Sequence, residues 1–586
     1  MDQKRLFLAI AISLAIMIGF QTLLAPNVPQ PPAKQTTTEA ARPATAGGAD
    51  ATPGASVGGS ATAPVTAATT VPKEVPRVPI EARRVKGSIS LLGARIDDLV
   101  LTDYRETIDP TSPFVRLLEP RSDAKPYYAQ YGWTAPPGET IKVPDNDTVW
   151  TSSGGTLGTD KPVTLSWNNG AGLTFLLEIS VDDEYLFSVR QSVKNATGEA
   201  VRLFPWSRIR RDYKPQVLGY YILFEGLLGV VDGKLQEITY DSAKSDGPKK
   251  KGIAFESAAV GGWTGITDKY WLAALIPDQQ MPSKIFFRYL GENGDHFQVD
   301  TITQDPQVTP AGGEATLASH LFAGAKQVYL LDHYQAQLNL PNFDKAVDFG
   351  WFYFLTKPIF SAIHYLNNLL GNFGLAIMLF TVAVKLVFFP LANYSYRSMS
   401  KMKLLAPKMQ EMRERLKDNP QEMQREMMAM YRAEKVNPAS GCLPILVQIP
   451  VFFALYKVLF VTIEMRQAPF FGWIKDLSQV DPTNVFNLFG LIPYDPMTLP
   501  LIGPMLHMGA WPLIMGVTMY LQQKLNPPPP DPIQAKLFQF MPIIFTFMLA
   551  GFPAGLVIYW SWNNLLSIGQ QWLIMRQTTL TKPKGT

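Results

Sequence analysis

The feature that most constrains this chain is an apolar stretch, residues 374–393, with one charged side chain near its middle. About 20 apolar residues are enough for a helix to cross a bilayer. Lys385 interrupts the stretch, and a charge at that depth costs roughly 2.5–3.5 kcal/mol on insertion scales, so it normally faces a bundle interior or a wet cavity. We therefore expect Lys385 to line a polar cavity among membrane helices.

The alternative for Lys385 is a side chain that extends along its helix to the lipid headgroups. Asn393, at the end of the stretch, is about 12 Å away at 1.5 Å per residue, and a lysine stem covers only part of that distance. No acidic residue in the predicted spans is placed to neutralise Lys385, which favours a hydrated pocket. Thr381 lies one turn before it on the same face. Other polar residues that could share the pocket are Gln448, Gln522, Gln523, Ser561, Asn563 and Asn564.

The whole chain is typical of a membrane protein with a large soluble part. Hydrophobic residues make up 47% of its 586 residues and charged residues 17%, a low charged share for a soluble protein. Lys4 and Arg5 precede the first apolar run, which predicts an uncleaved first span within 1–25 and a cytoplasmic N-terminus; a cleaved signal peptide is the alternative. We expect six spans in all, the other five at about 373–392, 443–463, 505–525, 537–552 and 554–575.

The segments outside the spans differ in composition. Residues 26–79 are rich in Pro, Ala and Thr and predict a disordered linker. Residues 80–345 alternate apolar and polar positions between turn signals, which predicts an antiparallel β-sandwich outside the cytoplasm. Residues 346–371 predict an amphipathic helix lying at the membrane interface; packing on the β domain is the alternative. A helical core over 372–576 and a short basic tail, 577–586, complete the chain.

The loop at 394–441 carries ten lysines and arginines against six acidic residues, so we expect it in the cytoplasm, as we do the C-terminus. It predicts a helical hairpin broken near Asn419 and Pro420. Methionine suits surfaces that accept varied apolar partners, but the two methionine stripes could equally pack on each other. The stripes consist of Met399, Met402, Met409, Met412, Met423, Met427 and Met430.

No motif for catalysis, nucleotide binding, metal binding or a cofactor is present, and the single cysteine, Cys442, excludes a disulfide framework. We therefore predict a protein that is not an enzyme and has no cofactor and no specific nucleic-acid site. Two other classes remain open. A secondary transporter with Lys385 in its substrate site would show inverted repeats, and a membrane-tethered sugar-modifying enzyme would show His and carboxylates clustered within 80–340.

Several runs resemble the YidC family of membrane protein insertases of the Gram-negative type, related to the mitochondrial oxidase-assembly insertases. They are MRERL, EMMAMYRAEKVNPASGCLPILVQIPVFFALYKVL, EMRQAPFFGWIKDLS and MPIIFTFMLAGFPAGLVIYW. The matches cover 394–478 and 538–572 nearly continuously. The preceding β domain resembles that family's external β-sandwich, which is of the galactose-mutarotase-like kind.

The resemblance implies that the chain inserts and folds nascent proteins in the bacterial inner membrane, alone or with the Sec translocon. It implies a hydrophilic groove, open to the cytoplasm and to lipid, in which Lys385 stands where relatives usually have arginine. Thr381 would line this groove, and Tyr559 and Trp560 would contact the entering helix, although relatives commonly have two tyrosines there. The tail would make only a weak contact with the ribosome through Lys582 and Lys584.

Overall fold

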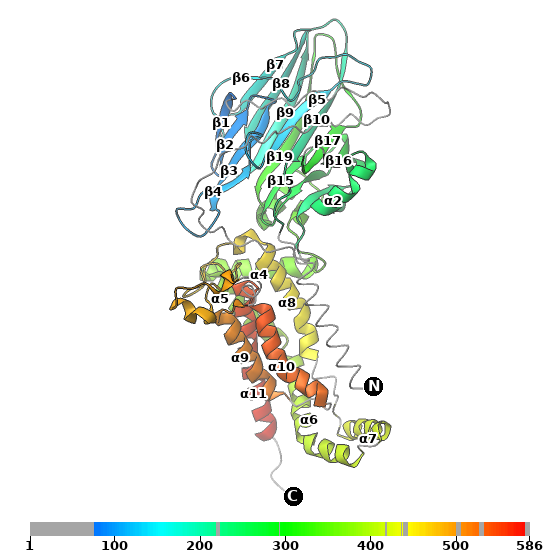
Figure 1. Ribbon diagram of the computed structural model, residues 1–586. Helices are drawn as coiled ribbons and strands as arrows, with labels where there is room; N and C mark the ends of the chain where they lie inside the picture. The colour runs from blue at the N-terminus through cyan, green and yellow to red at the C-terminus, as the bar shows by residue number, and fades with distance from the viewer. Residues whose placement is uncertain are drawn as a thin grey trace. The chain divides into compact units, whose positions relative to one another are not determined.

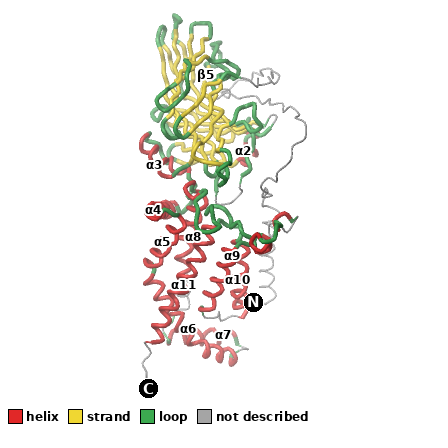
Figure 2. Tube along the Cα trace, turned by 90° about the vertical axis from the view of Figure 1, so that its left-hand side faces the viewer, coloured by secondary structure: helices red, strands yellow, loops and turns green. Residues whose placement is uncertain are grey.

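The structure is a computed structural model that describes residues 75–217, 223–291, 294–416, 419–434, 436, 443–499, 506–526 and 532–580. The chain forms two compact units, Met1–Asp348 and Phe349–Thr586. We call the described part of the first unit the β domain and that of the second the helical region (Figures 1 and 2). The predicted first span 1–25, most of the linker 26–79, and residues 581–586 of the tail lie outside the described residues.

The β domain consists of two antiparallel sheets. One has the order β1-β2-β3-β5-β10-β17-β16-β13, with β4 beside β3 and β18 beside β10; the other has the order β12-β11-β14-β15-β19-β9-β8-β7-β6. The strands are β1 (Arg77–Glu81), β2 (Val85–Ser90), β3 (Arg95–Arg105), β4 (Phe114–Leu118), β5 (Tyr127–Thr134), β6 (Thr151–Ser152), β7 (Val163–Asn168), β8 (Leu173–Val181), β9 (Leu186–Asn195), β10 (Val201–Arg211), β11 (Gly226–Val231), β12 (Lys234–Thr239), β13 (Ile253–Val260), β14 (Trp263–Thr267), β15 (Trp271–Ile276), β16 (Pro282–Leu290), β17 (His296–Thr303), β18 (Gln307–Thr309) and β19 (Glu314–Ala325).

The alternation of apolar and polar residues explains how these strands pack. In β8, every second side chain from Leu173 to Val181 is buried and those between are half-buried. The buried Phe175 of this strand meets Trp133 of β5 at 5.1 Å between ring centroids, and Trp133 stacks on Trp150. The expectation of a large β-rich domain followed by a helical region is confirmed. Strand β1 begins at Arg77, inside the range expected to be linker.

Several buried arginines of the β domain are paired with carboxylates, whereas the buried Arg95 donates to the backbone carbonyls of Leu92 and Asn146. Arg208 of β10 lies opposite Asp300 of β17, and its Nε donates to Asp300 Oδ1 at 2.9 Å. Arg288 of β16, diagonal to Asp300 on the next strand, donates to Oδ2 at 3.0 Å. All three side chains are buried. Arg211 forms a similar two-pronged pair with Asp268, both contacts at 2.7 Å.

Lys326 is a buried cation of the β domain whose hydrogen-bond partner is a hydroxyl group, with carboxylates nearby. It is buried, and its Nζ donates to Thr267 Oγ1 at 2.9 Å. Burial lowers the pKa of Lys326 to about 8, against the opposing effect of Asp348, Asp268 and other nearby carboxylates.

The helical region contains the chain's long helices. The described helices of the chain are α2 (Tyr240–Asp246) and α3 (Val328–Gln337) in the β domain, then α4 (Tyr353–Leu370), α5 (Phe373–Val387), α6 (Phe389–Arg415), α7 (Pro420–Ala433), α8 (Leu443–Val461), α9 (Ala510–Leu525), α10 (Pro532–Leu549) and α11 (Ala554–Leu580). α4 packs against α5 and α8, and Gly371, at φ 67°, ends it in the left-handed conformation that glycine adopts without strain.

Among the described residues, no single helix is both long enough and apolar enough to cross a bilayer. One bent pair passes that test together: Phe373–Val387 with Phe389–Leu405, bent by 68°. The span predicted at 373–392 is therefore not one straight helix. Pro390, in the first turn of α6, has no N–H to continue the hydrogen bonds of α5, which explains the break. Likewise α9 begins at Ala510 rather than at the predicted 505.

The last three helices pack in an order that chain sequence did not indicate. The turn between α10 and α11 predicts two helices side by side, yet α9 packs against both of them. α10 and α11 touch through side chains such as Phe545 and Trp560, whose rings are 6.0 Å apart.

A segment between α8 and α9, residues 467–484, covers one end of the helical region; we call it the cap segment. The carbonyl of Gln479 accepts from Ala554 N–H, at the start of α11, at 2.6 Å. Asp481 Oδ2 accepts from Trp511 N–H, at the start of α9, at 2.9 Å. The carbonyl of Pro469 accepts from the side chain of Asn372 before α5, at 3.3 Å. The cap segment thus ties together the starts of three helices beside the end of α4.

Candidate functional site

Lys385, near the C-terminal end of α5, lines a cavity of about 40 Å³. That volume has room for about two or three water molecules. Helices α5, α6, α8 and α11 all contribute to its wall. The other lining residues are Val384, Phe388, Leu391, Ala392, Tyr396, Val447, Gln448, Val451 and Gln570.

The partner of Lys385 is a neutral hydroxyl. Its Nζ donates to Ser567 Oγ at 2.8 Å, and Ser567 in turn donates to the carbonyl of Asn563 at 2.8 Å. Gln570 Nε2 approaches the backbone carbonyl of Lys385 at 3.4 Å. Within the described part of the chain, no carboxylate forms an ion pair with Lys385. The side-chain amine of Lys385 therefore has N–H donors beyond the one that Ser567 accepts.

Ser567 and Gln570 are missing from the residues that the sequence suggested. Asn563, Ser567 and Gln570 follow one another at intervals of four and three, which places them on one face of α11. Extending the line from Asn563 along the helix would have found both. That spacing along α11 is the signal in the sequence that identifies both residues.

A second group of predicted residues adjoins Lys385. Thr381, Gln448, Tyr559 and Asn563 line the narrow space beside it. Gln448 Nε2 donates to the hydroxyl of Tyr559, and Thr381 Oγ1 donates to the carbonyl of Ile377. Asn563 Oδ1 is buried without a hydrogen-bond partner among the described residues. The site therefore holds one cation, an amide–phenol pair and an unused acceptor.

Several residues that the sequence suggested lie elsewhere, and among them Gln523 of α9 and Ser561 and Asn564 of α11 do not line the space around Lys385. Trp560 faces α8 and α10: its ring is 4.6 Å from that of Phe452 and 6.0 Å from that of Phe545. Gln522 lies on α9 and is not among the residues that line the space around Lys385. Tyr559 and Trp560 are adjacent in sequence and point in different directions because neighbouring residues on a helix are about 100° apart.

Comparison with known proteins identifies the family. Residues 77–362 match the family model described as the YidC periplasmic domain, and residues 365–582 match the one described as the 60Kd inner membrane protein. A membrane protein insertase YidC of Granulibacter bethesdensis is 62% identical, over 100% of this chain and 99% of that protein. The chain belongs to the YidC family of membrane protein insertases. Another member, from Acidiphilium cryptum, is 54% identical over 86% of this chain and 85% of its own.

The family also has solved structures. A crystal structure of an active YidC insertase matches with 16% identity and a TM-score of 0.33, covering 85% of this chain and 92% of that one. The curated relatives are named as insertases, not for a catalysed reaction. Membership of the YidC family confirms the prediction of a membrane protein insertase, over the transporter alternative.

The methionines of this YidC family member do not form one surface. Met399 is buried against Ala392, Tyr396 and Ile574 of α11, with Met402 beside it. The other methionines of the stripes are half-buried where α6 and α7 face each other. There, Tyr431 donates to Met409 Sδ at 3.4 Å. The half-buried methionines of the two stripes are Met409, Met412, Met423, Met427 and Met430.

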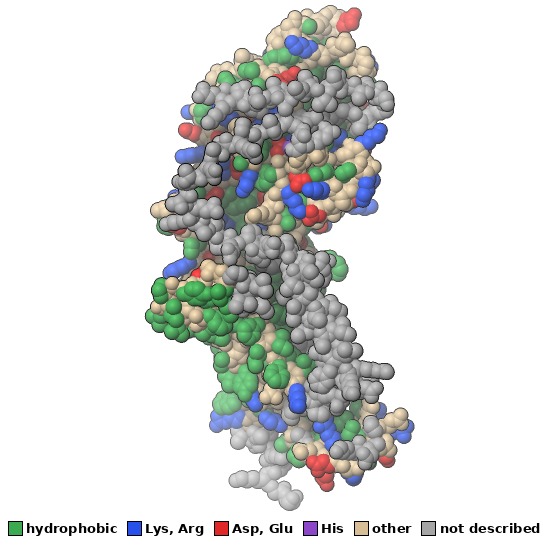
Figure 3. Space-filling model, in the orientation of Figure 1, with side chains coloured by type: hydrophobic (Ala, Val, Ile, Leu, Met, Phe, Trp, Pro, Cys, Tyr) green, Lys and Arg blue, Asp and Glu red, His purple; other side chains and the backbone are tan. Residues whose placement is uncertain are grey.

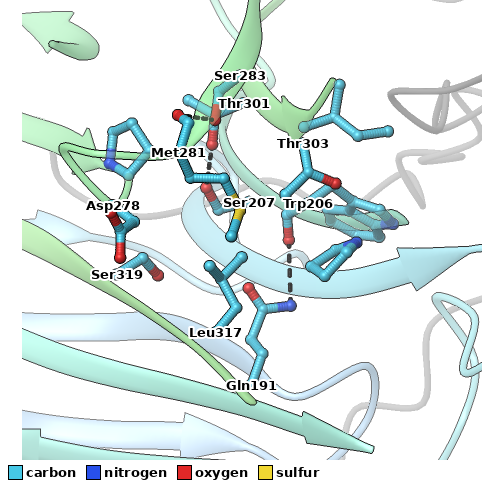
Figure 4. Close-up of a pocket in the computed structure, with 13 residues that line it drawn as sticks. Gln191, Trp206, Ser207, Asp278, Met281, Ser283, Thr301, Thr303, Leu317 and Ser319 are labelled. Carbon is cyan, nitrogen blue, oxygen red and sulfur yellow. Dashed lines mark hydrogen bonds between the residues drawn. The ribbon is translucent and has the colours of Figure 1, made fainter. Parts of the chain in front are cut away.

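The β domain holds a small cavity of about 20 Å³ between its sheets (Figure 4). Serines and threonines contribute to its wall; Ser207 and Thr301 share a hydrogen bond of 2.6 Å, and Gln191 Nε2 reaches the carbonyl of Trp206 at 3.5 Å. Of the described residues that line it, Asp278 is the one carboxylate and none is a histidine. The cavity therefore lacks the His and carboxylate cluster that a sugar-modifying enzyme would require.

Proposed function

We propose that this chain inserts nascent membrane proteins by sheltering their polar segments at Lys385. The observation that carries the proposal is a lysine in a cavity among apolar helices whose partner is a serine hydroxyl at 2.8 Å. Keeping an unneutralised ammonium among such helices is costly, so a purely structural role would favour an ion pair or an apolar residue. A cation left available suits a transient acidic or polar guest.

The other polar groups extend the shelter. Gln448, Tyr559 and the unused acceptor of Asn563 lie next to Lys385 and provide donors and acceptors in place of water. A polar client segment could bind there while its apolar span moves into lipid. Thr381 would line the path. Trp560, which packs on Phe452, would contact the client from the α8 side. The work done is differential solvation, without a chemical reaction.

The proposed topology is six spans with both termini and the hairpin 394–441 in the cytoplasm and the β domain in the periplasm. The basic excess of that hairpin supports this orientation, and Figure 3 shows Lys and Arg side chains gathered around α6 and α7. Partners on this model are nascent membrane proteins, membrane lipids, the Sec translocon and, through the short basic tail, the ribosome. α4 would lie in the membrane interface.

Reconstituted vesicles test the role of the charge. The client would be a single-span protein with an acidic external segment, and protease protection would measure its insertion. We expect Lys385→Ala to lower the inserted fraction several-fold and Lys385→Arg to restore most of it, because Arg keeps the charge. Lys524→Ala, a matched change at the exposed end of α9, should leave insertion unchanged. Equal insertion by Lys385→Ala and the parent protein would contradict the proposal.

Cross-linking tests whether the client segment passes beside Thr381. A photo-reactive residue at Thr381 should capture a stalled client span, and one at Val260, an exposed position of the β domain, should not. Capture confined to Val260 would place client contact outside the helical region.

A further inference from the structure

The loop that follows the cap segment exposes an unusual number of large apolar side chains. We call residues 485–498 the apolar loop; it contains two short 3₁₀ helices, η5 (Val485–Gly490) and η6 (Pro496–Thr498). Leu491 is 83% exposed. Figure 3 shows hydrophobic side chains gathered over this loop, at the left of the view, where Figure 1 draws it in orange. The exposed residues are Phe486, Leu488, Phe489, Leu491, Ile492, Tyr494 and Met497.

Asn484, at the end of the cap segment, and two polar side chains of the apolar loop accept hydrogen bonds from the backbone of the loop. Asn484 accepts from Phe486 N–H at 3.1 Å, Asn487 from Gly490 N–H at 2.9 Å, and Asp495 from Met497 N–H at 2.9 Å. Backbone N–H groups left without partners are costly away from water. Because these are already bonded internally, the loop can leave bulk water at little cost while its apolar side chains point outward.

The backbone also holds two bulky residues in an unfavourable conformation. Leu488 and Phe489 have φ values of 51° and 58°, in the left-handed region that large side chains rarely adopt. Such strain persists only where the surroundings enforce it, and it clusters at functional positions. Here the strained pair presents two of the exposed apolar side chains.

The position and charge of the apolar loop point to its partner. The cap segment fixes its start at the end of the helical region where α4 ends and α5, α9 and α11 begin. Exposed apolar side chains continue from there along α9 at Ile514 and Val517, and α4 exposes Phe354 and Tyr365. No lysine or arginine occurs from 476 to 523. Exposed Tyr494 and Trp473 beside an apolar surface suit the interface of a bilayer, and the lack of Lys and Arg fits the side away from the cytoplasm.

We propose that the apolar loop inserts into the lipid interface at the α4 end of the helical region. It would act as an interfacial anchor beside α4, with Leu491 and Ile492 deepest. Lipid fits better than a second copy of the chain because the apolar surface runs on along α9, a helix of an inner-membrane family, and does not form a closed patch.

Spin labels on the full-length protein test the insertion. In a Cys442→Ser background, Leu491→Cys and Ile492→Cys would each carry a nitroxide, with Val260→Cys as an exposed control in the β domain. The protein would be placed in vesicles of phosphatidylethanolamine and phosphatidylglycerol. We expect labels in the loop to collide several-fold more with oxygen, and several-fold less with a water-soluble nickel chelate, than the label at 260.

Three results would overturn the proposal. Equal accessibility of the three labels to the nickel chelate would place the loop in water. Dipolar broadening between loop labels, with the chelate excluded, would show that a second copy of the chain covers the loop. A further variant adds Leu491→Asp to the protein labelled at position 492. The label at 492 should then become more accessible to the nickel chelate. The label at 260 should keep its spectrum, which shows that the protein is still folded. No change at 492 would also count against insertion.

Discussion

Three buried arginines of the β domain and Lys385 of the helical region meet different kinds of partner. In the β domain, Arg208 and Arg288 share Asp300, and Arg211 pairs with Asp268. In the helical region, Lys385 has the hydroxyl of Ser567 and no carboxylate among the described residues. The first arrangement fixes a geometry, because each charge is satisfied by its partner. The second leaves a charge unsatisfied, which is what a site for a passing guest requires.

The difference has an energetic meaning. Removing one partner of a buried ion pair leaves an uncompensated charge and costs about 3–5 kcal/mol. Removing a charge that stands among apolar helices without a counter-ion removes a cost instead. Changes in stability and changes in insertion should therefore separate between the two regions, and the following predictions test that separation in order of expected effect.

The largest effect is expected at Asp300. Asp300→Asn leaves two buried guanidinium groups beside a neutral amide, so the free energy of unfolding of the β domain should fall by about 3–5 kcal/mol. Urea-dependent proteolysis of the full-length protein in detergent measures it. Glu139→Gln, which breaks an exposed pair with Arg202, should cost less than about 1 kcal/mol. Similar losses in both variants would remove the distinction drawn for the β domain.

A change in stability of the opposite sign is expected when Lys385 is replaced. Lys385→Met should keep or raise the stability of the helical region, by at most about 2.5–3.5 kcal/mol, because it removes a charge that the bundle leaves unpaired. Thermal unfolding in detergent measures the change, and Lys524→Met at the exposed end of α9 is the control. A loss as large as that of Asp300→Asn would reveal an anionic partner and break the comparison.

Lys326 allows a test by pH. Its folded-state pKa of about 8 lies below the ordinary lysine value of 10.5, so the unfolded chain binds the proton more tightly. The parent protein should therefore gain stability as pH rises from about 8 to about 10.5. Lys326→Met lacks this titration. At pH 7 its free energy of unfolding should exceed that of the parent protein by about 1–3 kcal/mol, and this difference should shrink as the pH rises to about 10.5. Urea unfolding at several pH values measures both proteins. A difference in the free energy of unfolding that stays constant with pH would refute the prediction.

The smallest effect is expected at Tyr559. Tyr559→Phe removes the hydroxyl that accepts from Gln448, a neutral hydrogen bond worth about 1 kcal/mol. Insertion should fall less than in Lys385→Ala, since the charge remains. Tyr520→Phe, at an exposed position of α9, is the matched control and should change neither stability nor insertion. A defect as deep as that of Lys385→Ala would make the amide–phenol pair, not the charge, the centre of the site.

The sequence placed several members of the site. Helical spacing put Thr381 and Lys385 on one face of α5, and the rarity of polar residues in apolar spans singled out Gln448 and Asn563. Spacing could not choose between Gln522 and Ser567 as neighbours of Lys385, because that choice depends on which helices touch. It also gave no sign that α9 packs against both α10 and α11, since the short turn specifies a reversal of direction and not a packing partner.

The sequence by itself determined the chemistry: which segments are apolar, where a lysine interrupts them, where the strands alternate, and to which family the chain belongs. Only the tertiary structure decided which groups meet. The 68° bend at Phe388 and the crossing of α5 and α11 bring Lys385 to Ser567, and the cap segment carries the apolar loop beside α4. Periodicity fixes the face of each helix, but contacts between helices depend on packing that no single segment encodes.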